Sequence, residues 1–121
     1  MSFICYKSLF KIKKMKVDEK LLNRIREALM HLDNIEEKPM FGGVCFMVND
    51  KMCICARNDR MMCRVGPKKY EACLEEIGCE PMIHGKRLMK GYVFIAEEGY
   101  RNKEDFDRWI KLSLDYNKEV K

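Results

Sequence analysis

The stretch from Met40 to Val65 constrains the fold more than any other part of this sequence, because it predicts three short strands in succession. Three segments of it are mostly apolar on both faces of the strands they predict: 44–48, 52–56 and 61–65. Asn49-Asp50 and Asn58-Asp59 lie between them and are typical turn residues. We therefore expect an antiparallel meander in the middle of a sheet, with other elements packed against it.

Amphipathic helices are predicted before and after this stretch. Asp18 can cap a helix whose apolar residues recur at helical spacing from 21 to 32. Pro67 suits the first turn of a second helix that ends at Gly78 and has one apolar stripe: Tyr70, Cys73, Leu74 and Ile77. Asn102 can cap a last helix with four residues on one face: Phe106, Trp109, Ile110 and Ser113.

Two further strands, over 79–83 and 92–96, are predicted between the second and the last helix. We expect Asn34–Pro39 to be a polar connector and Glu97–Gly99 to be a turn. Gly42-Gly43 predicts a bulge or a close backbone approach where the first strand begins. The predicted fold is a single α+β domain with a mostly antiparallel sheet, in the order helix–three strands–helix–two strands–helix.

The positive charge of the chain is concentrated at its start. Five of the 24 basic residues precede Val17: Lys7, Lys11, Lys13, Lys14 and Lys16. The remainder of the chain has 19 basic and 19 acidic residues. We expect residues 1–16 to be a basic leader outside a neutral domain of residues 17–121. A neutral domain argues against a broad phosphate-binding face. No apolar run approaches the ~20 residues that cross a bilayer, so we expect no membrane span and a cytoplasmic location.

Seven cysteines suggest two kinds of chemistry. Cys53 and Cys55 are two residues apart in a predicted strand, so we expect both on one face, near Cys45 and Cys63. A metal or redox cluster is one interpretation, but buried packing by reduced thiols is favoured, because the chain has no CxxC-type turn. Cys79 and His84 could be two metal ligands, but His31 is the only other histidine and four ligands do not assemble without distant cysteines. A cysteine–histidine catalytic pair stays open as a less favoured interpretation, because such pairs meet in space and not in sequence.

Lys86, Arg87 and Lys90 lie in a basic segment between two glycines and could bind a phosphate. The segment lacks the spacing of a P-loop or of a dinucleotide-binding fingerprint, so a solvated loop is favoured. A nucleic-acid-binding module that uses the basic leader and the Lys86–Lys90 loop stays open as an alternative. Aromatic residues that could stack on bases follow no RNA-recognition consensus: Phe46, Tyr92 and Phe94.

Several of these segments together resemble the TfoX N-terminal domain family, over roughly Val17 to Asn117. The resemblance rests on Met40-Phe41-Gly42-Gly43, Arg64-Val65-Gly66, Arg87-Leu88-Met89-Lys90-Gly91-Tyr92 and Trp109. It implies an α+β fold and no established catalytic residues, metal or cofactor. The best-known members are bacterial regulators of DNA-uptake competence that act on transcription through other proteins. Those regulators carry a second, C-terminal domain, for which this chain leaves no room, so we expect the domain without expecting the role in competence.

The resulting functional prediction is a small cytosolic regulatory or protein-interaction domain that is not an enzyme and has no cofactor. Its expected partner is a protein, and nucleic acid is the alternative partner. A thiol or metal protein is the remaining alternative. The predicted interaction surface combines the strand entry with the basic segment: Phe41, Gly42, Gly43, Lys86, Arg87, Lys90, Gly91 and Tyr92.

Overall fold

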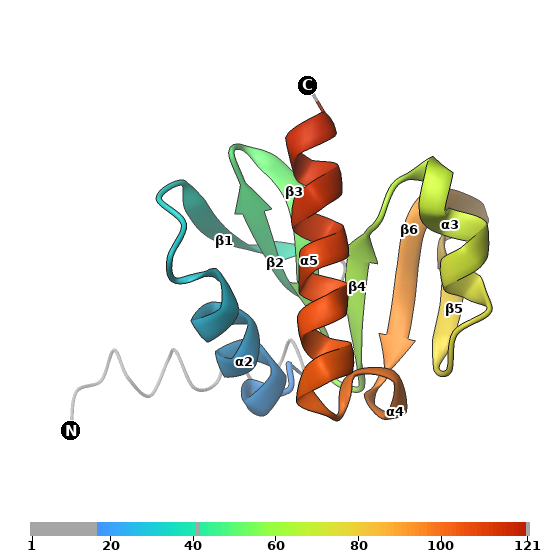
Figure 1. The fold of residues 1–121 in the computed structure, drawn as a ribbon, viewed down its shortest axis with the longest axis horizontal. Coiled ribbons are helices and arrows are strands. Elements are labelled where there is room, and N and C mark those ends of the chain that lie inside the picture. Colours follow the sequence, from blue (N-terminus) through green and yellow to red (C-terminus); the bar gives the residue numbers. More distant parts are fainter. Residues whose placement is uncertain (1–16, 41, 121) are drawn as a thin grey trace.

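A six-stranded antiparallel sheet with helices on one face forms the domain (Figure 1). The computed structural model describes residues 17–40 and 42–120. The elements in chain order are α2 (Glu19–Leu29), β1 (Ile35–Met40), β2 (Gly43–Val48), β3 (Lys51–Ala56), β4 (Arg60–Arg64), α3 (Pro67–Leu74), β5 (Cys79–His84), β6 (Arg87–Ala96), α4 (Glu97–Tyr100) and α5 (Lys103–Glu119).

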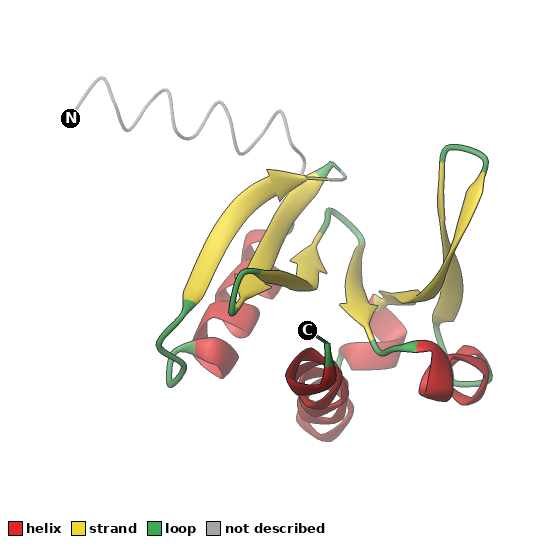
Figure 2. Cartoon of the chain, turned by 90° about the horizontal axis from the view of Figure 1, so that it is seen from above, coloured by secondary structure: helices red, strands yellow, loops and turns green. Residues whose placement is uncertain are grey.

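The sheet has the strand order β1-β2-β3-β4-β6-β5, and each neighbouring pair is antiparallel. The predicted α+β class and the central meander are therefore confirmed. Viewed from above, the helices lie together on one side of the sheet, and the two ends of the sheet rise on the other side (Figure 2). None of the described helices is long and apolar enough to cross a membrane.

Two predicted connections prove to be regular structure. The expected polar connector contains β1, which pairs with β2 along its whole length, so four strands and not three precede α3. An edge strand bonds on one side only and can be mostly exposed, which is why β1 tolerates Pro39 and has no apolar alternation. The expected turn after β6 is the short helix α4, in which Gly99 and Tyr100 are buried.

A bulge in β3 reverses one predicted side-chain direction. The register of β2 against β3 shifts so that Phe46 pairs with Ile54 and Met47 pairs with Met52, which leaves Cys53 as the extra residue. Cys53 consequently packs with Ile54 in the core beneath the helices, whereas Cys55 belongs to the core on the opposite face. The prediction that Cys53 and Cys55 share a face is wrong.

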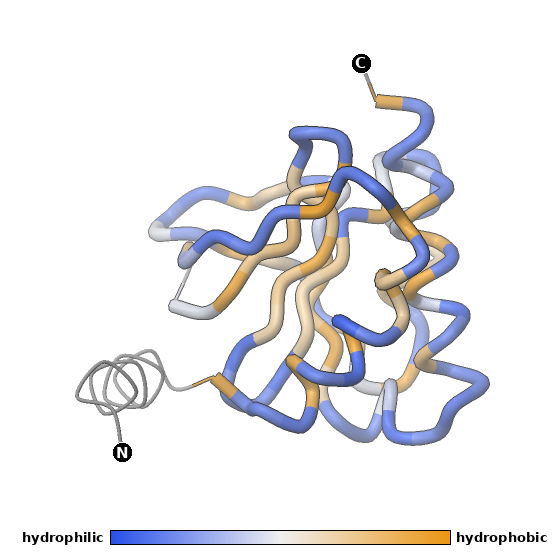
Figure 3. Tube along the Cα trace, turned by 90° about the vertical axis from the view of Figure 1, so that its left-hand side faces the viewer, coloured by the Kyte–Doolittle hydropathy of each residue, from blue (hydrophilic) through white to orange (hydrophobic). Residues whose placement is uncertain are grey.

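The helix-covered face holds the main core. Asp18 caps α2 by accepting hydrogen bonds from the backbone N–H groups of Lys20 and Leu21, as its sequence predicts. The buried residues of α2 and α5 occupy the predicted stripes and pack on the sheet: Leu21, Leu22, Ile25, Leu29, Phe106, Trp109, Ile110 and Ser113. In Figure 3 the apolar colours follow the central strands, while most turns and the outer parts of the helices are hydrophilic.

The helix α3 is shorter than its sequence predicts. It ends at Leu74 with Glu75 as its C-cap, so Gly78 is not the cap. Ile77 lies beyond the helix and is 74% exposed instead of completing the buried stripe. Gly78 has a φ of +76° and immediately precedes β5, so it provides the left-handed backbone conformation with which the chain enters that strand.

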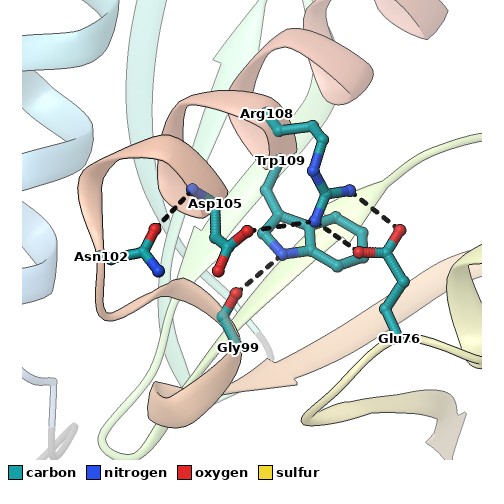
Figure 4. A network of polar contacts seen from close by, with 6 residues as sticks. All are labelled: Glu76, Gly99, Asn102, Asp105, Arg108 and Trp109. Carbon is teal, nitrogen blue, oxygen red and sulfur yellow. Dashed lines mark hydrogen bonds and ion pairs between the residues drawn. The ribbon is translucent and has the colours of Figure 1, made fainter.

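Several polar contacts fix α5 on the sheet. Trp109 is fully buried, and its indole N–H donates to the Gly99 carbonyl at 3.1 Å (Figure 4). Asn102 caps the helix by accepting from the backbone N–H of Asp105 at 2.8 Å. At the other end, Asn117 donates to the Val48 carbonyl at 3.0 Å. Both ends of the helix are therefore held against the rest of the domain.

Candidate functional site

The second core lies on the sheet face opposite the helices. Five buried residues from β2 to β6 form it: Cys45, Cys55, Met62, Met82 and Phe94. Four half-buried side chains border them: Met40, Met52, Met89 and Tyr92. We call this apolar surface, with the strand ends that rise around it in Figure 2, the concave face. The five residues of the cluster are at most 4% exposed, so a partner can contact this face only through the half-buried border. The methionine and aromatic side chains of that border are adaptable contact groups, which makes it the first candidate for binding.

The structure does not gather the predicted interaction residues into one surface. Gly42 and Gly43 lie where β1 turns into β2, at one edge of the sheet, whereas Lys86 lies in the β5–β6 turn at the other edge. Residues 87–92 run along β6, between that turn and the centre of the sheet. Phe41 lies outside the described residues.

Gly43 allows β2 to approach the end of β3 closely. A Cβ atom at Gly43 would lie 2.1 Å from the carbonyl oxygen of Ala56 and 3.1 Å from Cγ of Arg57. Gly42, with a φ of +73°, lies against the guanidinium of Arg57, 3.5 Å from the position that its Cβ would take. The glycine pair predicted to permit a close approach therefore does so, and it positions an arginine.

Arg57 and Arg60 flank a two-residue turn and converge on one aromatic ring. The Arg57 backbone N–H donates to the Arg60 carbonyl at 3.0 Å, which closes the turn between β3 and β4. Their guanidinium carbons lie 5.3 Å and 3.9 Å from the centroid of the Phe94 ring. Cations over an aromatic face are attracted by its quadrupole. We call these three side chains the arginine pair and its ring.

The charges of this arginine pair are poorly neutralised. Within the described part of the chain, the only ion pair of either arginine is that between Nε of Arg60 and Asp59, at 3.9 Å. That distance is too long for a hydrogen bond, and Nε of Arg60 is buried without an acceptor among the described residues. By contrast, Arg26 binds both carboxylate oxygens of Glu37 at 2.8 Å.

A third arginine lies at the other end of β4. The Arg64 guanidinium carbon is 5.2 Å from the ring centroid of Tyr92 and 5.5 Å from that of Tyr116. The next two residues, Val65 and Gly66, both donate backbone N–H groups to the Gly91 carbonyl, at 2.9 and 3.0 Å. The RVG and KGY segments that carry the resemblance are thus in direct contact.

The β5–β6 hairpin exposes apolar side chains next to basic ones. Ile83 and Leu88 are partners across the two strands and are 57% and 55% exposed. Their sequence neighbours Met82 and Met89 pack in the concave face, and successive strand side chains point to opposite sides. Three basic residues beside this pair are also exposed: Lys86, Arg87 and Lys90.

The cysteines that the structure describes do not assemble into a reactive cluster. Cys45 and Cys55 form a disulfide, which corrects the expectation of reduced thiols for these two residues. Burial raises the pKa of the Cys53 thiol to about 12 and raises the pKa of Cys63 as well. Such thiols form little thiolate at neutral pH and are poor nucleophiles.

No metal centre is found in the described part of the chain, where no three His, Cys, Asp or Glu residues could hold an ion together. The two proposed ligands Cys79 and His84 occupy opposite ends of β5. Four strand residues lie between them, and the five steps of strand place them roughly 16 Å apart, which is too far for one ion to bind both.

Sequence reasoning missed the arginine pair, although a signal for it was present. Arg57 and Arg60 immediately flank the predicted turn Asn58-Asp59, so they had to face each other on one side of the meander. Phe94 was considered only as a base-stacking residue, together with Phe46. The structure excludes Phe46 from that role, because its side chain is buried in the helix-covered core.

The comparisons with known proteins support one family. The family model described as TfoX N-terminal domain matches residues 27–116. Neither the curated proteins nor the solved structures yield a match. The matched segment includes the glycine pair, the arginine pair and the β5–β6 hairpin.

Proposed function

Because the chain belongs to the TfoX N-terminal domain family, we propose that it is a small cytoplasmic regulatory domain that acts by binding another protein. The proposed contact surface is the β5–β6 hairpin, which presents the Ile83–Leu88 pair on one side and borders the concave face on the other. In this proposal the domain performs no catalysis and regulates through its partner.

The observation that carries the proposal is the exposed Ile83–Leu88 pair. Each side chain is more than half exposed, and contact of this apolar area with water costs free energy of roughly 25 cal/mol per Å². An exposed aliphatic pair beside arginine and lysine side chains is a common composition for the centre and rim of a protein interface. A partner with apolar and acidic residues would complement it.

The chemistry of the remaining candidate groups supports a non-enzymatic role. The described thiols are in a disulfide or have raised pKa values, and Cys79 lies at the far end of β5 from His84. A nucleophile needs a base within hydrogen-bond reach or a lowered pKa. The buried Cys53 and Cys63 have neither a lowered pKa nor a histidine neighbour in the sequence.

Site-specific photo-crosslinking tests the proposal. A benzophenone amino acid at Lys86 of the full chain, expressed in its native cells, is expected to capture a defined protein. The double variant Ile83→Ser/Leu88→Ser should remove most of that product, because it replaces the apolar contact without touching the core. The matched control Met30→Ser/Ile77→Ser changes side chains that are 78% and 74% exposed elsewhere. Equal capture by both double variants would contradict the proposal.

A second candidate function is nucleic-acid binding by the hairpin. It is favoured by the exposure of Lys86, Arg87 and Lys90, which form no ion pair with described residues. Titration with single-stranded and duplex DNA and RNA at several salt concentrations tests it. Binding by these three cations should weaken about as the second to third power of the salt concentration, and salt-insensitive binding would exclude it.

A further inference from the structure

We propose that the arginine pair and its ring form the site that receives a carboxylate of the protein partner. The inference rests on the proposed function, since it names the chemistry by which the concave face would select a partner. The expected ligand is an acidic side chain of a segment that also carries apolar residues.

The geometry brings two cations to one point. Arg57 and Arg60 are adjacent across a closed turn, and both guanidinium groups lie within 5.3 Å of the centroid of the same Phe94 ring. Stacking on the ring orients each planar guanidinium while leaving its edge free for hydrogen bonds. A carboxylate that approaches this edge can bind one guanidinium bidentately, while the neighbouring cation adds to the favourable potential.

The charge arrangement separates this pair from the arginines that form ion-pair forks. Arg26 and Arg108 form forks with Glu37 and Glu76, so their charges are compensated within the domain. Arg60 has only a 3.9 Å contact to Asp59, and its buried Nε donor has no acceptor among described residues. The Nε atom is itself covered, but the Arg60 side chain is 33% exposed, so its outer N–H groups can still bind a ligand.

The stacking interaction alone does not require two arginines. Arg24 shows the structural use of such a contact: its guanidinium carbon lies 4.1 Å from the Phe106 centroid, and it donates to the Tyr100 carbonyl at 3.1 Å. In that case a single guanidinium stacks on the ring, and a backbone carbonyl accepts its hydrogen bond. Placing Arg57 and Arg60 together adds like-charge repulsion, which an anionic ligand would relieve.

A protein carboxylate fits the surroundings better than a nucleic-acid backbone. Phe94 belongs to a buried apolar cluster, and the half-buried side chains that border it, Met40, Met52 and Met89, suit contact with apolar side chains of a peptide. A backbone-binding groove instead presents many cations along its length, whereas residues 17–121 carry equal numbers of acidic and basic side chains.

Fluorescence anisotropy with a defined probe tests the site. The probe is a fluorescein-labelled peptide of alternating Glu and Leu residues, and its matched control has Gln in place of each Glu. We expect the full-length protein to bind the Glu peptide at least about tenfold more tightly than the Gln peptide, because charge-assisted hydrogen bonds are lost in the control.

Variants of single arginines locate the effect. Arg57→Gln and Arg60→Gln should each weaken Glu-peptide binding about tenfold, and Arg60→Lys should restore only part of the loss, because lysine keeps the charge but not the fork. Arg24→Gln is the matched control, since it removes a stacked arginine from the helix-covered side, and it should leave affinity unchanged. Tryptophan emission and circular dichroism check that each variant is folded.

Three outcomes would overturn the inference. The Glu and Gln peptides could bind equally, the arginine-pair variants could bind no worse than Arg24→Gln, or an unlabelled DNA oligonucleotide could displace the peptide at lower concentration than a Glu peptide does. If crosslinking at Lys86 still depends on Ile83 and Leu88 in any of these cases, the proposed function stands and only the carboxylate site fails.

Discussion

Cys53 and Cys55 are separated by one residue of β3, yet their side chains belong to cores on opposite faces of the sheet. The bulge at Cys53 adds one residue to the strand and so turns this side chain toward the helices. Cys55 keeps the regular direction and lies directly opposite Cys45 of the neighbouring strand β2, with which it forms the disulfide. The same bulge therefore separates a buried thiol from a disulfide.

This separation predicts different chemical behaviour for the two residues. In non-reducing alkylation of the native protein near pH 8, Cys53 should stay unmodified, and peptide mapping should recover Cys45 and Cys55 linked to each other. A pKa of about 12 instead of 9.0 lowers the thiolate fraction of Cys53 about a thousandfold, and burial slows the reaction further. Alkylation in denaturant is the control, and Cys53 should then react readily. Fast labelling of native Cys53 would contradict the bulge.

Burial of the Cys53 thiol also predicts a pH dependence of stability. Its pKa is higher in the folded chain than in the unfolded chain, so above about pH 9 the unfolded chain loses a proton that the folded chain keeps. The free energy of unfolding should therefore fall as pH rises from about 9 toward about 12, by up to about 1.4 kcal/mol per pH unit for this group. Urea unfolding between about pH 8 and pH 10 measures the slope. Cys53→Ala should reduce the slope by the share of this one group, because Cys63, Cys73 and Cys79 also have raised pKa values and keep contributing. An unchanged slope would contradict the assignment.

The fold was largely predictable because its signals are local. The caps Asp18 and Asn102, the apolar stripe of α5 and the turns of the meander act within a few residues of sequence. The strand β1 could not be predicted in this way, because its stability comes from hydrogen bonds to β2 and not from an apolar face. The bulge at Cys53 depends on the register between two strands, which alternation in one strand does not reveal.

The candidate site was less predictable than the fold. The glycines and the basic residues indicated two features that the structure contains, the close approach at Gly43 and the exposed hairpin. The prediction, however, combined both in one surface. Their separation follows from the strand order, in which β6 joins β4 and the β5–β6 hairpin becomes the far edge. A prediction of the arginine pair and its ring would have required two facts together: the turn between β3 and β4, and the pairing of Met62 with Phe94.

The close approach at Gly43 predicts a large effect for a small substitution. In Gly43→Ala the added Cβ would lie 2.1 Å from the Ala56 carbonyl oxygen, so the β2–β3 pairing has to shift. We expect a loss of about 2–3 kcal/mol in the free energy of unfolding. Gly85→Ala is the comparison, because its Cβ meets nothing within 4 Å and only its φ of +66° is unfavourable, at about 1 kcal/mol. A smaller loss for Gly43→Ala than for Gly85→Ala would contradict the geometry.

The buried amide of Asn117 predicts a second stability effect. Asn117 is 4% exposed and donates to the Val48 carbonyl at 3.0 Å, which joins the end of α5 to β2. Asn117→Leu should lower the free energy of unfolding by about 1–3 kcal/mol, because the substitution removes a buried donor. Asn117→Asp should also be destabilising, since a carboxylate cannot donate to a carbonyl. Thermal unfolding followed by circular dichroism measures both, and a neutral Asn117→Leu would contradict the role of this bond.

Lys51 stabilises the same helix end from the start of β3. Its ammonium group donates to the carbonyl oxygens of Asn117, at 2.8 Å, and of Val120, where a positive charge is favourable at a helix C-terminus. Lys51→Met should lower the free energy of unfolding by about 0.5–1.5 kcal/mol, as measured by urea unfolding with the single tryptophan as the probe. Lys111→Met is the matched control, because Lys111 forms only an exposed ion pair with Asp115 on the same helix, worth at most about 0.5 kcal/mol. If the two lysine variants lose the same stability, Lys51 does not act as the cap of α5, and the helix end is held by Asn117 alone.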